Sequence, residues 1–226
     1  MSTRTAAPDE IQTRVVVRPV GNPLPLGFLA LMVATTTVAM LQLGVIGPEQ
    51  GHVVALGVLV LTVPLQAIAS VLGFLARDPV AGTGMGVLAG TWAAVGFTML
   101  GAPPGATSPA LGVLLVCSAV AMVVPTVAAT GKLAGLSVMG LSAARFAVTG
   151  VGQLTGSPVW LTGAGWLGVA LGLLAAYAAL AFELEDVQHA TVLPVGRRGP
   201  GADTMTASTR EELATVAHEA GVRKQV

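Results

Sequence analysis

Charged residues are scarce in this chain, and acidic residues are absent from its long apolar stretches. Asp, Glu, Lys and Arg make up 10% of the 226 residues, whereas soluble domains usually carry about 25%. Hydrophobic residues reach 54%, so the composition excludes an ordinary soluble domain and predicts a membrane protein. Because the formal net charge is zero, a generally basic nucleic-acid-binding protein is excluded as well.

Groups that carry enzymatic chemistry are equally few. The single cysteine, Cys117, can form no internal disulfide and is predicted to be buried and inert within its apolar run. The three histidines lack the spacing of metal ligands: His52, His189 and His218. The sequence shows no nucleophile–base pair and no phosphate-binding glycine loop. It therefore predicts a protein that is not an enzyme and that needs no cofactor or metal.

Six runs are long enough to cross a bilayer as helices, which takes about 20 mostly apolar residues. They cover roughly residues 25–47, 53–76, 80–101, 109–130, 133–153 and 159–182. Their length and the absence of period-two alternation favour helices over strands. We therefore predict an all-α, polytopic membrane protein with a six-helix domain at 21–186. A polar tail at 1–20 precedes it, and a tail at 187–226, with a short helix, follows.

The basic residues predict the orientation of the chain. Ten of the eleven Lys and Arg residues lie outside the runs, either before the first run or after the second, fourth or sixth run. The alternate joints, at roughly 47–52, 102–108 and 154–158, contain none. Since basic residues favour the cytoplasmic side, both termini are predicted to be cytoplasmic in a multi-pass cell-membrane protein. The first twenty residues lack the apolar core of a cleavable signal peptide, so the first run is expected to direct insertion.

The first run is preceded by a rigid segment that contains Asn22, Pro23 and Pro25. The prolines fix φ and lack backbone N–H groups, and a proline is tolerated at a helix start because its donor would be unpaired there. The Asn22 carboxamide can accept from free N–H groups of the first turn. From the residues alone, a capped start of a membrane helix and a functional motif explain this pattern equally well.

Arg145 is the one residue well inside a run that is charged at neutral pH. A charge at mid-membrane is costly, so such residues usually face a wet cavity and mark a pathway. An arginine there can hold a carboxylate through two N–H groups. Snorkelling to the interface, or a structural role among helix carbonyls, explains Arg145 equally well from sequence alone.

Two other features concern the interior of the runs. Pro64 frees a backbone carbonyl and is expected to kink the second run, and Gln66 is expected either to bond that carbonyl or to line a polar path. Glycines recur at spacing four, which favours close helix packing without a ligand role. The pairs are Gly86 with Gly90, Gly131 with Gly135, Gly152 with Gly156, and Gly168 with Gly172.

Both ends of the membrane domain resemble the acetate uptake transporter family, which includes the acetate/succinate permeases. The family's opening motif, Asn-Pro-x-Pro-Leu-Gly, is matched by Asn22-Pro23-Leu24-Pro25-Leu26-Gly27. Its closing stretch is similar to Gly165-Trp166-Leu167-Gly168, then Tyr177, then Thr191-Val192-Leu193-Pro194-Val195-Gly196. Gln66 falls where the family has a glutamine in the second span.

The resemblance implies a six-helix protomer, usually assembled as a hexamer, with a narrow path for small mono- or dicarboxylates through each protomer. Passage in the family is described as proton symport or as anion-channel flow. The family narrows this path with a phenylalanine, a tyrosine and a leucine, whose positions fall here on Leu31, Leu88 and Ala144. None of the three keeps the family's residue, and Arg145 lies directly beside the third position.

Two functions are expected from these patterns. The first is a transporter or channel for small carboxylates, with acetate as the main candidate solute, succinate as a second one and protons as partners in the symport variant. The second is a non-transporting membrane scaffold or interaction protein of the same fold, since the constriction differs from the family's. Lipid and further copies of the chain are the other expected partners. The predicted solute-contacting residues are Asn22, Pro23, Pro25, Leu31, Gln66, Leu88, Ala144 and Arg145.

Overall fold

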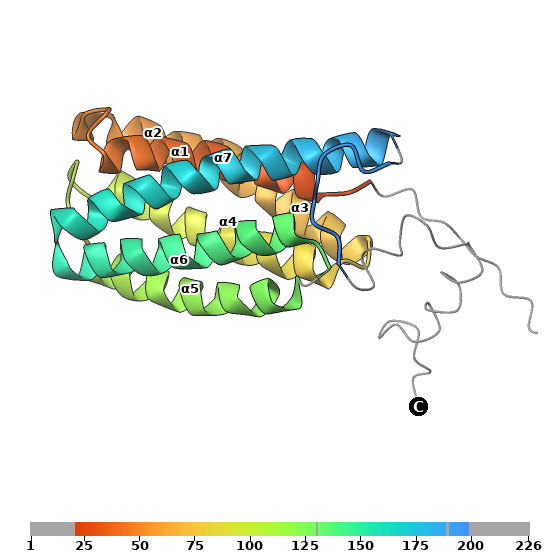
Figure 1. Cartoon of the computed structure of the whole chain (residues 1–226). Helices are drawn as coiled ribbons and strands as arrows, with labels where there is room; N and C mark the ends of the chain where they lie inside the picture. The colour runs from red at the N-terminus through yellow and green to blue at the C-terminus, as the bar shows by residue number, and fades with distance from the viewer. Residues whose placement is uncertain (1–20, 130, 189, 199–226) are drawn as a thin grey trace, which may run out of the picture.

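The structure of the protein is a computed structural model that describes residues 21–129, 131–188 and 190–198. Within these residues every regular element is helical, which confirms the predicted all-α class. The helices lie side by side along one common direction and form an elongated bundle (Figure 1). The predicted tail at 1–20 and the predicted short helix near 209–221 lie outside the described residues.

Six stretches are long and apolar enough to cross a membrane, as predicted. The second is a composite of η1 (Pro48–Gln50), α2 (Gly51–Gly57), the π-helical turn η2 (Val58–Thr62) and α3 (Val63–Leu75). The other five are α1 (Leu24–Gln42), α4 (Pro79–Gly101), α5 (Pro109–Ala128), α6 (Leu133–Thr155) and α7 (Pro158–Gln188). The predicted bounds agree to within a few residues, except that the first helix ends at Gln42, the second span begins at Pro48 and the last helix continues to Gln188.

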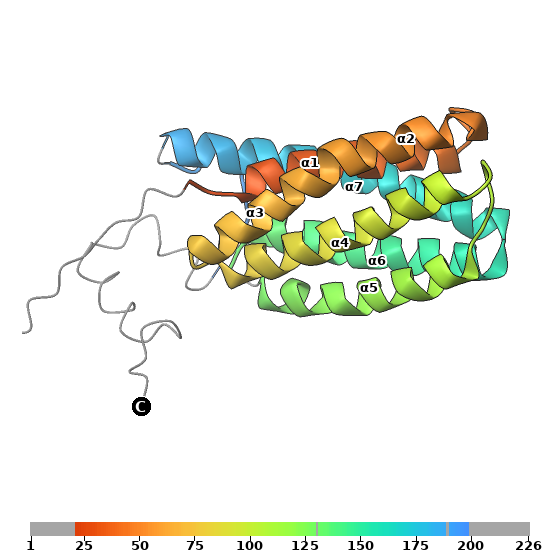
Figure 2. The ribbon, with the colours of Figure 1, turned by 180° about the vertical axis from the view of Figure 1, so that it is seen from behind.

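The joints between helices divide between the two ends of the bundle. Residues 43–47, 102–108 and 156–157 lie at one end, here called the loop end, and Figure 2 shows the same division from behind. Residues 76–78, 129, 131–132 and 190–198 lie at the other end, together with the start of α1, and we call this the terminal end. The first and last described residues therefore share one end, as six crossings require.

Helix starts follow the chemistry expected from the sequence. A proline stands in the first turn of α1, α4 and α5, where a missing N–H costs no hydrogen bond. The Asn22 side chain accepts from Leu24 N at 3.1 Å, as predicted. Asp78 accepts from Ala81 N at 2.9 Å and Ser108 from Leu111 N at 3.3 Å in the same way. These caps satisfy backbone donors that the helices themselves leave unpaired.

Close helix packing depends on glycine at several contacts. A Cβ on Gly112 would lie 2.9 Å from the carbonyl oxygen of Gly150, so α5 and α6 approach backbone to backbone. Gly168 and Gly172 of α7 face α1, where a Cβ would clash with the side chains of Ala39 and Thr36, which confirms the packing role predicted for that pair. Gly86 and Gly90 differ, since both are exposed on α4 and a Cβ on Gly90 would meet nothing within 4 Å.

The second span departs from a regular helix just before Pro64. The π-helical turn Val58–Thr62 lies there, which is the kind of irregularity that a proline introduces into the backbone ladder. The Thr62 hydroxyl donates to the Ala30 carbonyl of α1 at 2.9 Å. Gln66 Nε2 lies 3.5 Å from the Gly27 carbonyl of α1. The prediction that Gln66 bonds the carbonyl freed by Pro64 is therefore wrong, because its side chain reaches across to another helix.

The prediction that Cys117 is buried is also wrong, since its side chain is exposed on α5. Apolar residues cover the outer surface of this bundle as well as its interior: Val113, Val120, Val124 and Val127 of the same helix are all exposed. In a membrane helix, an apolar neighbourhood in the sequence does not separate the lipid-facing side from the core.

Candidate functional site

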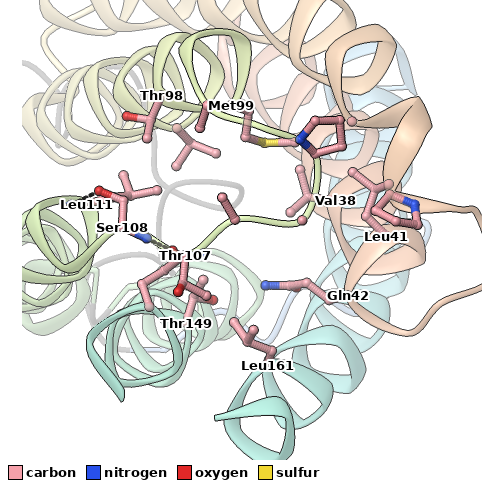
Figure 3. Close-up of a pocket in the computed structure, with 18 of the residues that line it drawn as sticks. Val38, Leu41, Gln42, Thr98, Met99, Thr107, Ser108, Leu111, Thr149 and Leu161 are labelled. Atoms are coloured by element: carbon pink, nitrogen blue, oxygen red, sulfur yellow. Dashed lines mark hydrogen bonds between the residues drawn. The ribbon is translucent and has the colours of Figure 1, made fainter. Parts of the chain in front are cut away.

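A cavity of about 410 Å³ lies at the loop end of the bundle (Figure 3). We call it the large cavity. Its lining residues come from α1, η1, α2, α4, α5, α6 and α7 and from the joints at 102–108 and 156–157. Its volume falls in the range of small-molecule sites, about 300–1,000 Å³. It is therefore formed by almost the whole bundle and depends on the tertiary packing of distant segments.

The wall of the large cavity is apolar with a few neutral polar groups. Val38, Leu111 and Leu161 are among its apolar residues, and among the described residues no Asp, Glu, Lys or Arg lines it. Of the residues that the structure describes, His52 is the one titratable residue in this wall, with Nε2 3.3 Å from the Ala102 carbonyl oxygen. The hydroxyl and amide side chains in the wall are Gln42, Thr98, Thr107, Ser108, Thr149, Gln153 and Thr162.

A smaller cavity of about 190 Å³ lies at the terminal end. We call it the small cavity. Leu24, Phe28, Asp78 and Lys132 contribute to its wall. Burial lowers the pKa of Lys132, and the positive charge of Arg197 lowers it further, while Asp78 and Asp186 act in the opposite direction. The Lys132 ammonium also lies 5.2 Å from the centroid of the Phe182 ring. This end of the bundle therefore carries fixed charge, in contrast to the wall of the large cavity.

The two cavities are separated by a closed layer of buried side chains. Along α1 the small cavity reaches Phe28 and the large cavity begins at Val38, ten residues apart or about 15 Å of helix. Leu31 lies between these positions. Equivalent spacing along α4 and α6 places further buried side chains at the same level. Leu31, Leu88, Trp92, Arg145 and Phe146 are each at most 3% exposed.

Arg145 lies in this closed layer and is 1% exposed. Its Nη2 lies 3.5 Å from Gln42 Oε1, the outer limit of a hydrogen bond. Its guanidinium carbon lies 5.4 Å from the ring centroid of Trp92. Nη1 has no hydrogen-bond partner among the described residues. The cation is thus buried with one weak amide contact and one aromatic face, and no carboxylate neutralises it within the described chain.

Two neighbours connect Arg145 to the large cavity. Gln42 lines that cavity, and Figure 3 shows its side chain extending into the space with the terminal nitrogen foremost. Thr149 also lines the cavity, and its hydroxyl donates to the carbonyl oxygen of Arg145 at 2.8 Å. Arg145 therefore lies about one helical turn beyond the cavity wall, with Gln42 between the guanidinium and the open space.

Gly168 of α7 makes room for the guanidinium. A Cβ at this position would lie 2.8 Å from the Arg145 guanidinium carbon and 2.8 Å from the Ala39 side chain. Real Cβ atoms essentially never approach this closely, so any larger residue would have to displace the arginine or α1. The backbone of α7 therefore forms one wall of the arginine site.

Two other buried polar atoms in this region have no partner among the described residues. They are Trp92 Nε1 and Gln66 Oε1. A buried polar group without a partner costs free energy unless water or a solute satisfies it. Trp92 is in contact with Arg145, so an unsatisfied donor lies beside an unsatisfied cation.

The predicted solute-contacting residues divide into three groups in the structure. Leu31, Leu88, Gln66 and Arg145 are buried inside the bundle. Asn22, Pro23 and Pro25 lie at the start of α1, far along that helix from Arg145's neighbour Gln42. Neither cavity is lined by Asn22, Gln66 or Arg145. The predicted residues are thus not gathered around one open cavity in this conformation.

Ala144 is the exception among these residues and requires a correction. Its side chain is exposed on the outer face of α6, so it does not narrow the interior of this protomer beside Leu31 and Leu88. Adjacent helical positions point in directions about 100° apart, and it is the next residue, Arg145, that turns inward. The position expected from the sequence thus lies in the same helical turn as Arg145, but its side chain is on the outer face of α6.

The C-terminal strap, residues 190–198, covers the start of α6. Leu133 N donates to Gly196 O at 3.1 Å, and Ala134 N donates to Val195 O at 3.1 Å. These are first-turn donors that α6 cannot satisfy by itself. Gly196 has φ of +64°, and a Cβ there would lie 2.7 Å from that of Leu133. The closing motif thus acts as a helix cap supplied from a distant part of the chain.

Two side-chain contacts hold the strap against α7. The Tyr177 hydroxyl donates to the Pro194 carbonyl at 2.8 Å, and Arg197 forms an ion pair with Glu185. Burial lowers the pKa of Arg197. These contacts give a structural reason for the spacing of Tyr177 and the closing stretch that the sequence displays.

Sequence reasoning did not identify Gln42 or Trp92 as part of the site. Gln42 stands near the end of the first run, where an amide is ordinary for a membrane interface, and Trp92 reads as an apolar core residue. Both are recognised only because folding brings them to Arg145, across 103 residues in the case of Gln42. The one available signal was that Gln42, like Gln66 and Gln153, is an amide within a predicted span.

Comparisons with known proteins support the fold. A solved structure described as the bacterial acetate channel SatP superposes with a TM-score of 0.70 at 21% identity. The match covers 77% of this chain and 98% of SatP. No protein-family model matches the chain, and no curated protein matches it. The predicted six-helix membrane fold, and the likeness to acetate permeases at the level of the fold, are thereby confirmed.

Proposed function

We propose that this protein is a channel or transporter that lets small carboxylates, acetate above all, cross the membrane through each protomer. The observation that carries the proposal is Arg145, a buried cation with an unpartnered N–H group one turn below a solute-sized cavity. A buried charge is costly unless it is paired. An anion arriving from the large cavity supplies the missing partner, and the likeness to an acetate channel favours the same solute class.

The wall of the large cavity favours a short monocarboxylate over a dicarboxylate. Within the described part of the chain, Arg145 is the cation that lies beyond its inner end, and no Lys or Arg lines the cavity itself. One carboxylate group can be held by one guanidinium, whereas a second carboxylate would lie against apolar side chains such as Leu115 and Leu161. Acetate therefore fits this arrangement better than succinate does.

Any proton coupling that accompanies passage does not run through an acid at mid-membrane, because the one buried carboxylate among the described residues, Glu185, lies at the terminal end in an ion pair with Arg197. No Asp or Glu occurs in the sequence between Asp78 and Glu183, and Glu49 and His52 are exposed at the loop end. The proton then travels on the acid itself or is exchanged at these end residues. Passage of the protonated acid, or anion-channel flow, is the mechanism that this arrangement favours.

The closed layer provides the reason to keep a second candidate function. Leu31 and Leu88 are fully buried and separate the two cavities, so passage requires side chains of this layer to move. A non-transporting scaffold of the same fold would need no such movement. Both candidates share a cell-membrane location, cytoplasmic termini, a non-enzymatic role and, by resemblance, assembly into a homo-oligomer such as a hexamer.

Uptake of labelled acetate into proteoliposomes tests the proposal. Wild-type vesicles are expected to exceed empty vesicles, and Arg145→Gln is expected to lower the acetate flux at low acetate concentration by about tenfold or more, because a hydrogen bond to a charged group contributes roughly 1.5–3 kcal/mol. Arg198→Gln is the matched control, since it removes an exposed positive charge at the terminal end. Wild-type flux equal to that of empty vesicles would favour the scaffold.

A further inference from the structure

Gln42 occupies the position between the large cavity and the buried cation. Its Oε1 faces Arg145 Nη2 at 3.5 Å, which leaves the two N–H donors of its Nε2 for other partners. Its side chain extends into the cavity with this nitrogen foremost (Figure 3). One amide thus presents an acceptor to the cation and donors to whatever occupies the cavity.

No other side chain in the cavity wall combines these two contacts. Gln153, the other amide, uses its Oε1 to accept from Ser108 N at 2.8 Å and lies against a joint of the chain. The Thr149 hydroxyl donates its hydrogen bond to the Arg145 carbonyl, so it can only accept a hydrogen bond from a solute. A carboxylate, which can only accept hydrogen bonds, finds a donor at Gln42 and none at Thr149.

We propose that Gln42 is the carboxylate-selecting residue of this protein, binding the anion in the large cavity and passing it to Arg145. This inference rests on the proposed function. The carboxylate first accepts from Gln42 Nε2 and then replaces Gln42 Oε1 beside the guanidinium. Replacing the weak 3.5 Å contact costs little free energy, because an amide oxygen binds a guanidinium less strongly than a carboxylate does.

The decisive variant is Gln42→Glu, which is nearly isosteric. It replaces the neutral amide oxygen beside Arg145 by a carboxylate of the protein itself, which would neutralise the guanidinium. It also removes the Nε2 donor that would bind the solute. Acetate flux at low concentration is expected to fall at least tenfold while Arg145 is unchanged. Gln42→Leu removes donor and acceptor without adding charge, and we expect it to raise the KM for acetate several-fold.

Gln153→Glu is the matched control, because it adds the same charge to the same cavity wall without contact to Arg145. Its flux is expected to fall less than threefold, since only the general field of the cavity changes. Thermal midpoints in detergent, measured for every variant, identify any protein that fails to fold. Gln42→Leu then carries the test if Gln42→Glu is misfolded.

The outcomes separate the two proposals. If Gln42→Glu and Gln153→Glu lower flux equally, or if Gln42→Leu keeps the wild-type KM, Gln42 does not select the anion. If in addition Arg145→Gln lowers flux, the proposed function stands without this inference. Wild-type flux no higher than that of empty vesicles overturns the proposed function itself.

Discussion

At the scale of single residues, the central feature is the buried guanidinium of Arg145, whose hydrogen-bonding groups the described residues satisfy only in part. Arg145 keeps one amide contact and one aromatic face in place of the water it has lost. The space that it occupies depends on the absence of a side chain at Gly168. An arginine held this loosely can change partners, whereas one held by several carbonyls could not do so at low cost.

A methyl group at position 168 should disturb this site. In Gly168→Ala the new Cβ would lie 2.8 Å from both the guanidinium carbon and Ala39, and overpacking of this kind costs about 1–3 kcal/mol. We expect a lower thermal midpoint in detergent and a reduced acetate flux. Gly163→Ala, on the same helix, is the control, because its Cβ would lie 3.9 Å from Val148 in ordinary contact. Equal behaviour of the two variants would contradict the described packing.

At the scale of elements, the first turn of α6 is completed by a segment more than fifty residues further along the chain. The strap offers backbone carbonyls to Leu133 and Ala134, and its Arg197 pairs with Glu185 of α7. A helix that begins at a membrane surface still needs partners for its first N–H groups. The strap supplies them and joins α6 to α7 at the terminal end.

Gly196→Ala should detach the strap. The residue has φ of +64°, and its Cβ would lie 2.7 Å from that of Leu133, so the variant suffers both backbone strain and a clash. Gly44→Ala separates these effects, because Gly44 has φ of +69° with nothing within 4 Å of the new Cβ. We expect Gly196→Ala to lose more thermal stability and to expose residues 190–198 to protease. An equal loss of thermal stability in both variants would mean that backbone strain alone explains the loss, without a contribution from the contact with Leu133.

At the scale of the whole molecule, the described part of the bundle holds one of these cavities near each end, with the layer of buried side chains between them. The large cavity lies at the loop end, and the described residues put no fixed charge in its wall, whereas the small cavity lies at the terminal end and is lined by Lys132 and Asp78. The distribution of basic residues predicts that the terminal end faces the cytoplasm.

This orientation can be measured with cysteines at the two ends. In a Cys117→Ser background, Ala106→Cys at the loop end should react in intact cells with a membrane-impermeant maleimide. Arg198→Cys at the terminal end should react only after the membrane is opened. Both positions are exposed, so accessibility to the reagent reflects the side of the membrane. The reverse pattern would overturn the predicted orientation while leaving the fold unchanged.

Much of the architecture could be predicted from the sequence, whereas the candidate site could be predicted only in part. Six long apolar runs and their proline and glycine joints locate the spans, because the thickness of the membrane sets their length. Arg145 was identified because a charge in such a run is costly. The inward direction of Arg145, the outward direction of Ala144 and the exposure of Cys117 depend on which face of each helix meets its neighbours. Apolar residues cover both faces here, so no periodicity in the sequence records that choice.

The sequence alone thus determined that this is a six-span, all-α membrane protein with one costly cation inside, since span length and charge burial are local properties. Only the tertiary structure decided what surrounds that cation. Gln42, Trp92 and Gly168 come from three other helices and meet Arg145 through packing. Contacts of this kind between distant segments depend on how whole helices fit together. The sequence of any one helix does not contain them.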